Sequence, residues 1–206
     1  MLVATALTRI KRQFGDEYGT LLDDTDIFGW FHEGQLDIIR TTGCNDTTVS
    51  NTVASYPLAI PSPIRVKRVS ISGIALTPSS IDEIDLLGQS DEATGAVQYW
   101  YLQNGQLILW PTGSTPTSTP VNLVYSKVPV EITSSGDSFS IPEVYHEDLV
   151  RFCMSRAHNR NRNFDAEKMD IEAYSSNISK RISEAQASDV PLYRGGDPMD
   201  FNEFDY

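Results

Sequence analysis

Residues 141–188 contain two runs of apolar residues at helical spacing, separated by a polar segment at residues 158–163. The first run opens at Ser140-Ile141-Pro142-Glu143, where Pro142 suits a first helical turn because that turn leaves its amide position unbonded. The two apolar stripes consist of Tyr145, Leu149, Phe152, Cys153 and Ala157, and of Ile171, Tyr174, Ile178, Ile182 and Ala185. The same spacing places Glu147, Asp148, Arg151 and Ser155 on the opposite, polar face of the first helix. We therefore predict two antiparallel helices whose stripes must be covered by other elements.

Two helical stripes near the N-terminus are the best candidates for that cover. The first consists of Val3, Leu7, Ile10 and Phe14 and stops at Gly15. The second begins at an N-cap within residues 23–25 and ends at Gly43, since aspartate and threonine cap helix starts and glycine ends helices. Gly34 lies on the apolar face of this second helix, so we expect another helix to approach closely there.

Between residues 45 and 139 the pattern changes from helical spacing to the alternation of strands. Residues 97–102 and 107–110 predict a hairpin, because Asn104-Gly105 between them suits a tight turn with positive φ. Residues 121–125 predict a further strand. The alternation slips by one residue at Lys67-Arg68, which predicts a β-bulge.

Two connections in this region are also predicted from their composition. Leu86-Leu87, preceded by three acidic residues, indicates a short helix or turn. Residues 111–120 are rich in threonine, serine, proline and glycine, and predict an exposed loop.

The order of these elements predicts an α+β fold with a four-helix body made of two N-terminal and two C-terminal helices. The body comprises residues 1–44 and 140–188, and a β-rich insertion of residues 45–139 lies between its halves. The helices flank the insertion, so they must meet in space if they share one core.

The remaining segment, residues 189–206, combines acidic residues with four aromatic ones, Tyr193, Phe201, Phe204 and Tyr206. Glycine and proline residues prevent a regular helix over most of it. A solvated chain end is one interpretation. The other is an extended C-terminal arm whose aromatic rings dock on a partner, which accounts for the aromatic residues as well.

Composition narrows the classes of function. The chain has 206 residues, 40% of them hydrophobic, which is enough for a packed core. The net charge of −12 argues against a protein that wraps nucleic acid by neutralising phosphates. Only Cys44 and Cys153 are present, so a disulfide scaffold is not expected and Cys153 is interpreted as a buried free thiol. No apolar run is long enough to cross a bilayer, so we expect a soluble protein with no membrane partner.

No pattern in the sequence indicates catalysis or a cofactor. Glu143, His146 and Glu147 could share a helix face and bind a metal ion, but solvated helix polarity is the simpler interpretation. There is no nucleophile elbow, phosphate-binding glycine loop or cysteine pair at zinc spacing. We therefore predict no catalytic, cofactor-binding or metal-ligating residues.

One basic cluster, Arg156, Arg160 and Arg162, lies at the link between the two C-terminal helices. The simpler interpretation is positive charge placed at a helix C-terminus, where it favours the helix dipole. The alternative is a contact with a neighbouring subunit or with DNA in a channel, because guanidinium groups pair with carboxylates and phosphates.

Taken together, the chain resembles the head-to-tail adaptor (connector) proteins of tailed bacteriophages, including the tail tubular protein A group. The resemblance rests on several loose patterns that together cover most of the chain. They are the Asp26 to Arg40 helix with Trp30 and Glu33-Gly34-Gln35, the proline-flanked strands of residues 58–69, Tyr99-Trp100-Tyr101, Asn104-Gly105, Leu107-Ile108-Leu109-Trp110-Pro111, Leu123-Val124-Tyr125, and Ile141-Pro142.

The resemblance implies a virion protein at the head–tail junction that forms a ring, usually of twelve copies, beneath the portal protein. It implies that the C-terminal arm reaches the portal, with Tyr193, Phe201, Phe204 and Tyr206 as anchors, and that the β insertion meets a tail or nozzle protein. DNA would pass through the ring during ejection without sequence-specific binding, helped by an acidic lumen. The loop of residues 111–120 would be a candidate downstream contact.

Two alternatives remain open at this point. One is another virion role, such as a tail-completion or decoration protein. The other is an enzyme such as a cell-wall hydrolase with an unrecognised site.

Overall fold

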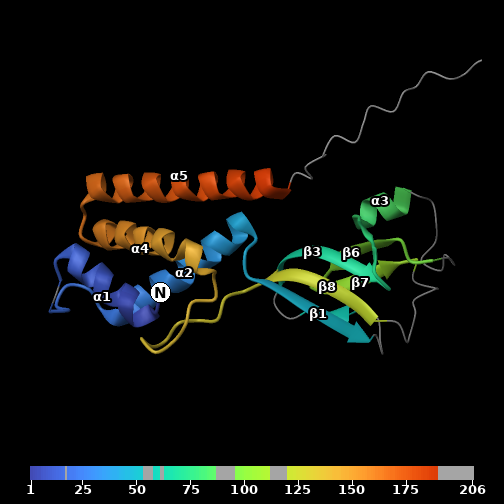
Figure 1. Cartoon of the computed structure of the whole chain (residues 1–206), viewed down its shortest axis with the longest axis horizontal. Coiled ribbons are helices and arrows are strands. Elements are labelled where there is room, and N and C mark those ends of the chain that lie inside the picture. The colour runs from blue at the N-terminus through green and yellow to red at the C-terminus, as the bar shows by residue number, and fades with distance from the viewer. Residues whose placement is uncertain (17, 53–57, 61–62, 87–95, 112–119, 190–206) are drawn as a thin grey trace, which may run out of the picture.

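The computed structural model describes residues 1–16, 18–52, 58–60, 63–86, 96–111 and 120–189 (Figure 1). Its helices are α1 (Val3–Phe14), α2 (Asp24–Thr42), α3 (Ile81–Leu86), the 3-10 turn η2 (Glu143–Tyr145), α4 (His146–Arg160) and α5 (Phe164–Asp189). Its strands are β1 (Asp46–Thr52), β2 (Leu58–Ala59), β3 (Pro63–Ile71), β4 (Ile74–Ala75), β5 (Thr77–Pro78), β6 (Tyr99–Gln103), β7 (Gln106–Trp110) and β8 (Pro120–Lys127). The described residues thus form a mixed α+β fold, as predicted. None of the described helices has the length and apolar character needed to cross a membrane.

The ends of α1 and α2 follow from local signals. The Asp23 side chain accepts a hydrogen bond from the Thr25 amide at 3.0 Å and so caps the start of α2. Gly15 and Gly43 end α1 and α2 with φ values of 81° and 70°, a conformation that glycine adopts without strain. These boundaries confirm the predicted N-terminal helices.

Helix α4 lies in the middle of the helical region, in contact with α1 and α2 on one side and with α5 on another (Figure 1). Leu149, Phe152, Cys153 and Ala157 of α4 are buried in a core that also includes residues of the other three helices. Helix α5 runs antiparallel to α4, because Asp148 meets Arg181 while His158 meets Asp170. The predicted antiparallel pair is therefore confirmed.

Gly34 allows α2 and α4 to approach each other closely. A Cβ atom at this position would lie 2.5 Å from Leu149 Cδ1 and 2.8 Å from Phe152 Cδ1. Both distances are shorter than van der Waals contact, so a larger residue at this position would have to displace Leu149 and Phe152. The close approach predicted at Gly34 is confirmed.

The predicted polar face of α4 is wrong at two positions. Asp148 and Ser155 are buried, because α5 covers the face that a single amphipathic stripe would leave to solvent. Asp148 accepts hydrogen bonds from Arg181 Nε at 2.7 Å and Asn177 Nδ2 at 3.0 Å. Ser155 Oγ donates to the Phe152 carbonyl oxygen at 2.7 Å.

The predicted stripe on α5 is also wrong at Ile171, which is 37% exposed. The side of α5 that faces α4 carries Asp170, Tyr174, Asn177, Ile178 and Arg181. One residue corresponds to about 100° of helix rotation, so Ile171 lies at the margin of this face beside Asp170. Polar residues thus form part of the contact between α5 and α4, at a place where the sequence pattern predicted isoleucine.

The β region consists of two four-stranded sheets, named here sheet A (order β1-β8-β3-β4) and sheet B (order β2-β7-β6-β5). One apolar core lies between them, with Val69, Leu123 and Tyr125 from sheet A and Leu107 and Leu109 from sheet B. Residues 99–110 form the predicted hairpin, whose first strand begins two residues later than expected, with Asn104 and Gly105 at φ values of 51° and 75°. The alternation predicted strands, but not their division between two sheets.

Hydrogen bonds hold together the chain segments that join the helices to sheet A. Strand β1 begins three residues after Gly43, and β8 lies beside it in antiparallel register. Ser126 Oγ of β8 donates to the Gly43 carbonyl oxygen at 2.7 Å, and Asn45 Nδ2 donates to the Lys127 carbonyl oxygen at 3.2 Å. The end of α2 is therefore bonded to both strands of the connection.

Candidate functional site

The link between α4 and α5 is built by backbone hydrogen bonds that close the end of α4. The Asn161 amide donates to the Ala157 carbonyl oxygen, and the Arg162 amide donates to Asn159 at 2.9 Å. Arg162 has a φ of 57°, the left-handed conformation in which a helix commonly ends and which glycine or asparagine usually occupies. Arg162 therefore has a backbone conformation that is unfavourable for any residue with a side chain.

Two of the three arginines predicted as contact residues bind carboxylates of α2. Arg156 Nη2 lies 3.4 Å from Glu33 Oε2, and its guanidinium stacks on the Phe152 ring at 5.0 Å from the centroid. Arg160 pairs with Asp26. Arg162 has no ion-pair partner within the described part of the chain. The structure thus brings Arg156 and Arg160 onto α2 and leaves Arg162 at the link.

A hollow of about 470 Å³ lies next to this link. It is lined by Arg160, Lys11 and residues 19–24 of the α1–α2 connection. Lys11 pairs with Asp24, and the buried Asp16 carboxylate accepts hydrogen bonds from the Thr20 and Leu22 amides, which shapes the connection. The hollow is open and polar, and two of its charged lining residues, Lys11 and Asp24, are paired with each other.

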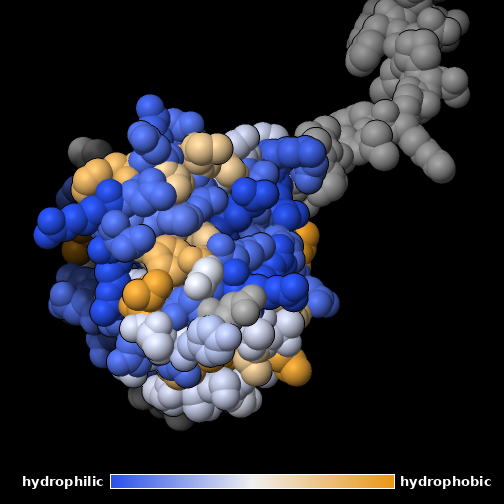
Figure 2. Space-filling model, turned by 90° about the vertical axis from the view of Figure 1, so that its left-hand side faces the viewer, coloured by the Kyte–Doolittle hydropathy of each residue, from blue (hydrophilic) through white to orange (hydrophobic). Residues whose placement is uncertain are grey.

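Apolar side chains are exposed at the same end of the molecule. Tyr18 and Leu21 of the α1–α2 connection are 92% and 61% exposed, and Phe164 at the start of α5 is 63% exposed. Figure 2 looks onto this end and shows hydrophobic residues between hydrophilic ones. Exposed apolar residues mixed with paired charges suit contact with another protein better than chemistry on a small molecule.

The three residues weighed as metal ligands are engaged by other groups of the protein, and the amino group of Met1 contacts two of them, Glu143 and His146, the latter at Nδ1 with a distance of 2.9 Å. Glu143 accepts from the amino group of Met1 at 2.8 Å, and Glu147 pairs with Arg9. The His146 ring packs against Phe139, and its Nε2 lies 3.1 Å from the Ile141 carbonyl oxygen. Burial lowers the pKa of His146, so the ring is neutral in this environment. Within the described residues no group of three metal-ligating side chains comes together.

The buried side chains that could act as nucleophiles, Cys153 and Tyr174, both belong to the packed core of the helices. Cys153 is fully buried in the helical core, and burial raises the pKa of its thiol well above the usual range. The Tyr174 hydroxyl donates to Asp37 of α2, and burial raises the pKa of that phenol. Neither group is held in the charged, reactive form.

The four aromatic anchor candidates, Tyr193, Phe201, Phe204 and Tyr206, lie outside the described residues, as does most of the loop at residues 111–120. Three cations of β3 that share one face of sheet A, Arg65, Lys67 and Arg68, were not predicted from the sequence. The phase slip at Lys67-Arg68 was the signal that could have revealed them, because an extra residue in a strand changes which side chains share a face.

Comparison with known families identifies the class of protein. The family model described as SU10 adaptor protein, a phage head-to-tail adaptor family, matches residues 1–195. No curated protein matches the chain. Membership of an adaptor family implies a structural protein of the virion that interacts with other virion components, such as portal and tail. The chain therefore belongs to the SU10 adaptor protein family, which confirms the resemblance drawn from its sequence patterns.

Proposed function

We propose that this protein forms a ring of twelve copies that joins the portal to the tail or nozzle and leaves a channel for the genome. The observation that carries the proposal is the match of the phage adaptor family over residues 1–195, which spans every described helix and strand. A ring of identical subunits requires heterologous contacts, in which one face of a subunit meets a different face of the next.

Each region of the chain has a separate role in this proposal. Residues 1–44 and 140–188 act as one four-helix body, a role supported by the shared core of α1, α2, α4 and α5. Residues 45–139 form the β-rich insertion that meets the tail or nozzle protein. Residues 189–206 form the extended arm that meets the portal.

The arginine cluster takes part in contacts between subunits or faces the channel. Arg156 and Arg160 already pair with Glu33 and Asp26 of the same subunit. In a ring, a neighbouring subunit would therefore add contacts to these existing ion pairs. Arg162 is the member best placed to reach a neighbour's carboxylate. The net charge of −12 supports passage of DNA without retention, because an acidic wall repels phosphates.

The arm binds the portal through its aromatic residues, Tyr193, Phe201, Phe204 and Tyr206. Several arms dock on one portal ring, and the first bound arm raises the effective concentration of the others. Individually weak arm contacts can therefore produce a stable junction.

The test is assembly of the protein on the purified portal ring, followed by native mass measurement and electron microscopy. We expect the full chain to bind as a ring, whereas a chain lacking residues 189–206 keeps its circular dichroism spectrum but does not bind. Absence of any association between the full chain and the portal would overturn the proposal. A truncated chain that unfolds would show that these residues belong to the core.

A further inference from the structure

The outer face of sheet A carries a cluster of positive charge formed by Arg65, Lys67 and Arg68 of β3, named here the basic face. Arg65 lies opposite Ser126 of β8, and Arg68 lies opposite Val124. Directly opposed residues share a face of a sheet, and Ser126 and Val124 lie on the face opposite to Tyr125 and Leu123, which belong to the core between the sheets. Ser126 is itself buried, where it bonds to the Gly43 carbonyl oxygen. Arg65 and Arg68 therefore point away from the core between the two sheets.

The β-bulge in β3 creates this cluster. The register shifts between Val66 and Arg68, so that Lys67 is an extra residue without an opposing partner. In a regular strand Arg68 would point to the opposite side from Arg65, into the core. The inserted residue moves Arg68 to the outer face and leaves Val69 fully buried.

Most of the charge on the basic face is uncompensated. Lys67 Nζ pairs with Asp46 Oδ2 of β1 at 2.8 Å. Arg65 and Arg68 are exposed, and neither has an ion-pair partner among the residues that the structure describes. The outer-face residues of β1 and β8 beside them, Thr48, Ser50, Asn122 and Val124, carry no charge. Asp46, the acidic residue in register with Ser126 and Arg65, is already paired with Lys67, so two arginines without an ion-pair partner among the described residues remain on this face of a chain with a net charge of −12.

A matching acidic surface lies on the other side of the β region, on α3. Ser80 and Glu83 form a capping box, in which the Glu83 amide donates to Ser80 Oγ at 3.2 Å and the Ser80 amide donates to Glu83 Oε2 at 2.9 Å. Ile84 is buried and anchors the helix. Asp82 and Asp85 are exposed and three residues apart, so they occupy the same side of α3. Neither has an ion-pair partner in the described ranges.

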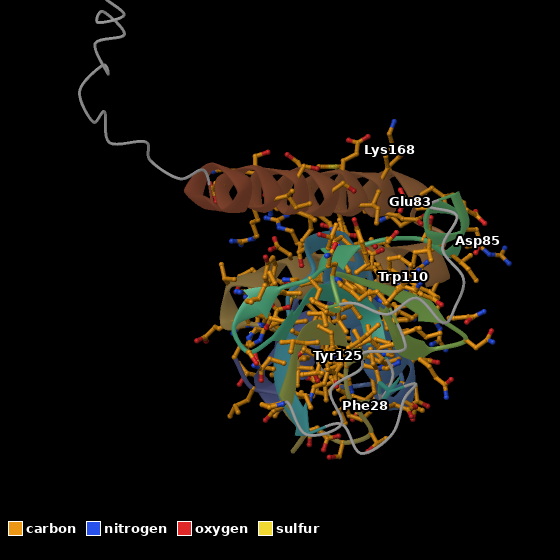
Figure 3. All side chains as sticks on the ribbon, turned by 90° about the vertical axis from the view of Figure 1, so that its right-hand side faces the viewer. Phe28, Glu83, Asp85, Trp110, Tyr125 and Lys168 are labelled. Carbon is orange, nitrogen blue, oxygen red and sulfur yellow. The ribbon has the colours of Figure 1, made fainter. Side chains whose placement is uncertain are left out.

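The two surfaces belong to different parts of the β region. Helix α3 follows β5, the edge strand of sheet B, whereas the basic face belongs to sheet A. Figure 3 shows α3, with Glu83 and Asp85 labelled, on one side of the β region and the strands of sheet A on the other. A heterologous ring contact needs two different, complementary faces on opposite sides of one subunit.

We infer that the basic face of one subunit binds α3 of the next copy of this chain, with Arg65 and Arg68 facing Asp82 and Asp85. This inference rests on the proposed ring and adds the β-region contact between its subunits. Each subunit offers two cations on one surface and two carboxylates on the other, whereas DNA binding would leave the acidic surface without a partner. Electrostatic complementarity of this kind fixes register and excludes wrong contacts.

The experiment is a charge-swap series measured on the portal ring. One variant carries Arg65→Glu and Arg68→Glu, and a second carries Asp82→Lys and Asp85→Lys. Each variant alone places like charges across the contact, so we expect subunit association to weaken by at least roughly a hundredfold. A chain carrying all four substitutions, and an equimolar mixture of the two variants, both restore opposite charges and should recover ring assembly.

Recovery distinguishes a broken contact from a damaged fold, because a misfolded variant would not be rescued by its partner. Lys168→Glu with Lys180→Glu on the exposed side of α5 is the matched control and should assemble normally. If the unaltered protein forms no ring, the proposed function itself fails. If rings form and neither swap variant is impaired, only the inference fails. Loss of DNA retention by the Arg65/Arg68 variant with normal assembly would also overturn it and assign the face to the genome.

Discussion

Gly34 determines how closely α2 and α4 pack, and a single substitution tests this. We expect Gly34→Ala to lower the free energy of unfolding by about 1–3 kcal/mol, because the added Cβ overlaps Leu149 and Phe152 in a packed core. Gly29→Ala on the same helix is the matched control. A Cβ at Gly29 meets nothing within 4 Å, so this change should stabilise α2 by about 0.5–1 kcal/mol. Urea denaturation measures both, and equal effects at the two sites would contradict the packing argument.

Arg162 combines a disfavoured backbone conformation with a side chain proposed to contact a neighbour. Its φ of 57° is left-handed, so Arg162→Gly should raise the free energy of unfolding by about 0.5–1 kcal/mol. If the side chain serves ring formation, the same variant should assemble less well despite its greater stability. Thermal denaturation and portal-dependent assembly measure the two effects separately. A loss of stability would assign the arginine a structural role instead.

His146 should make stability depend on pH near neutrality. Burial lowers its pKa in the folded protein below the unfolded value of about 6.5. As the pH falls below about 6.5, His146 therefore binds a proton in the unfolded chain but not in the folded protein, and the free energy of unfolding decreases. This decrease continues until the pH reaches the lowered pKa of the folded state. Between about pH 7.5 and 5.5, His146→Gln should flatten the dependence in urea titrations, and an unchanged slope would exclude His146 as its source.

Residue-scale features with a local cause were predictable from the sequence. Asp23 caps α2, and Asn104-Gly105 forms its turn, because neighbouring residues are sufficient to determine both. The burial of Asp148 was not predictable. Its partner Arg181 lies 33 residues further along, and periodicity within α4 contains no information about which helix will cover it.

At the scale of elements, the Asp148–Arg181 pair fastens α5 to α4. Asp148→Ala should lower the free energy of unfolding by about 2–4 kcal/mol, since it leaves a partly buried guanidinium without its carboxylate. Hydrogen exchange should show the loss of protection concentrated in α5. Glu184→Ala removes an exposed pair with Lys180 on the same helix and should change stability by less than about 0.5 kcal/mol. Similar losses from both variants would contradict the role of burial.

The division of the β region into two sheets could not be predicted from the periodicity of the sequence. The hairpin of β6 and β7 has clear alternation, and its turn fixes the pairing. Strand β1 contains one apolar residue, Val49, so its sequence resembles a polar loop. It becomes a strand because β8 pairs with it along its whole length. Long-range pairing of this kind depends on partners that a local pattern does not identify.

At the scale of the whole molecule, the proposed arm can be tested without disturbing the fold. Phe201→Ala and Phe204→Ala should each weaken portal docking by about 2 kcal/mol, because buried aromatic residues commonly carry that much binding energy at interfaces. Surface plasmon resonance on immobilised portal measures the loss, and Asn202→Ala between them serves as a control. Unchanged docking by both phenylalanine variants would remove them as anchors.

The hydrogen bonds that join Gly43, Ser126 and the Asn45–Lys127 pair have a mechanical consequence. A single peptide tether would act as a hinge and let the sheets swing independently of the helices. Two chain segments that are hydrogen-bonded side by side, the one after Gly43 and the end of β8, resist bending. A force or torque applied to the sheets is therefore transmitted to the end of α2. An adaptor built in this way can transmit a displacement at its far end to its helices as a lever does.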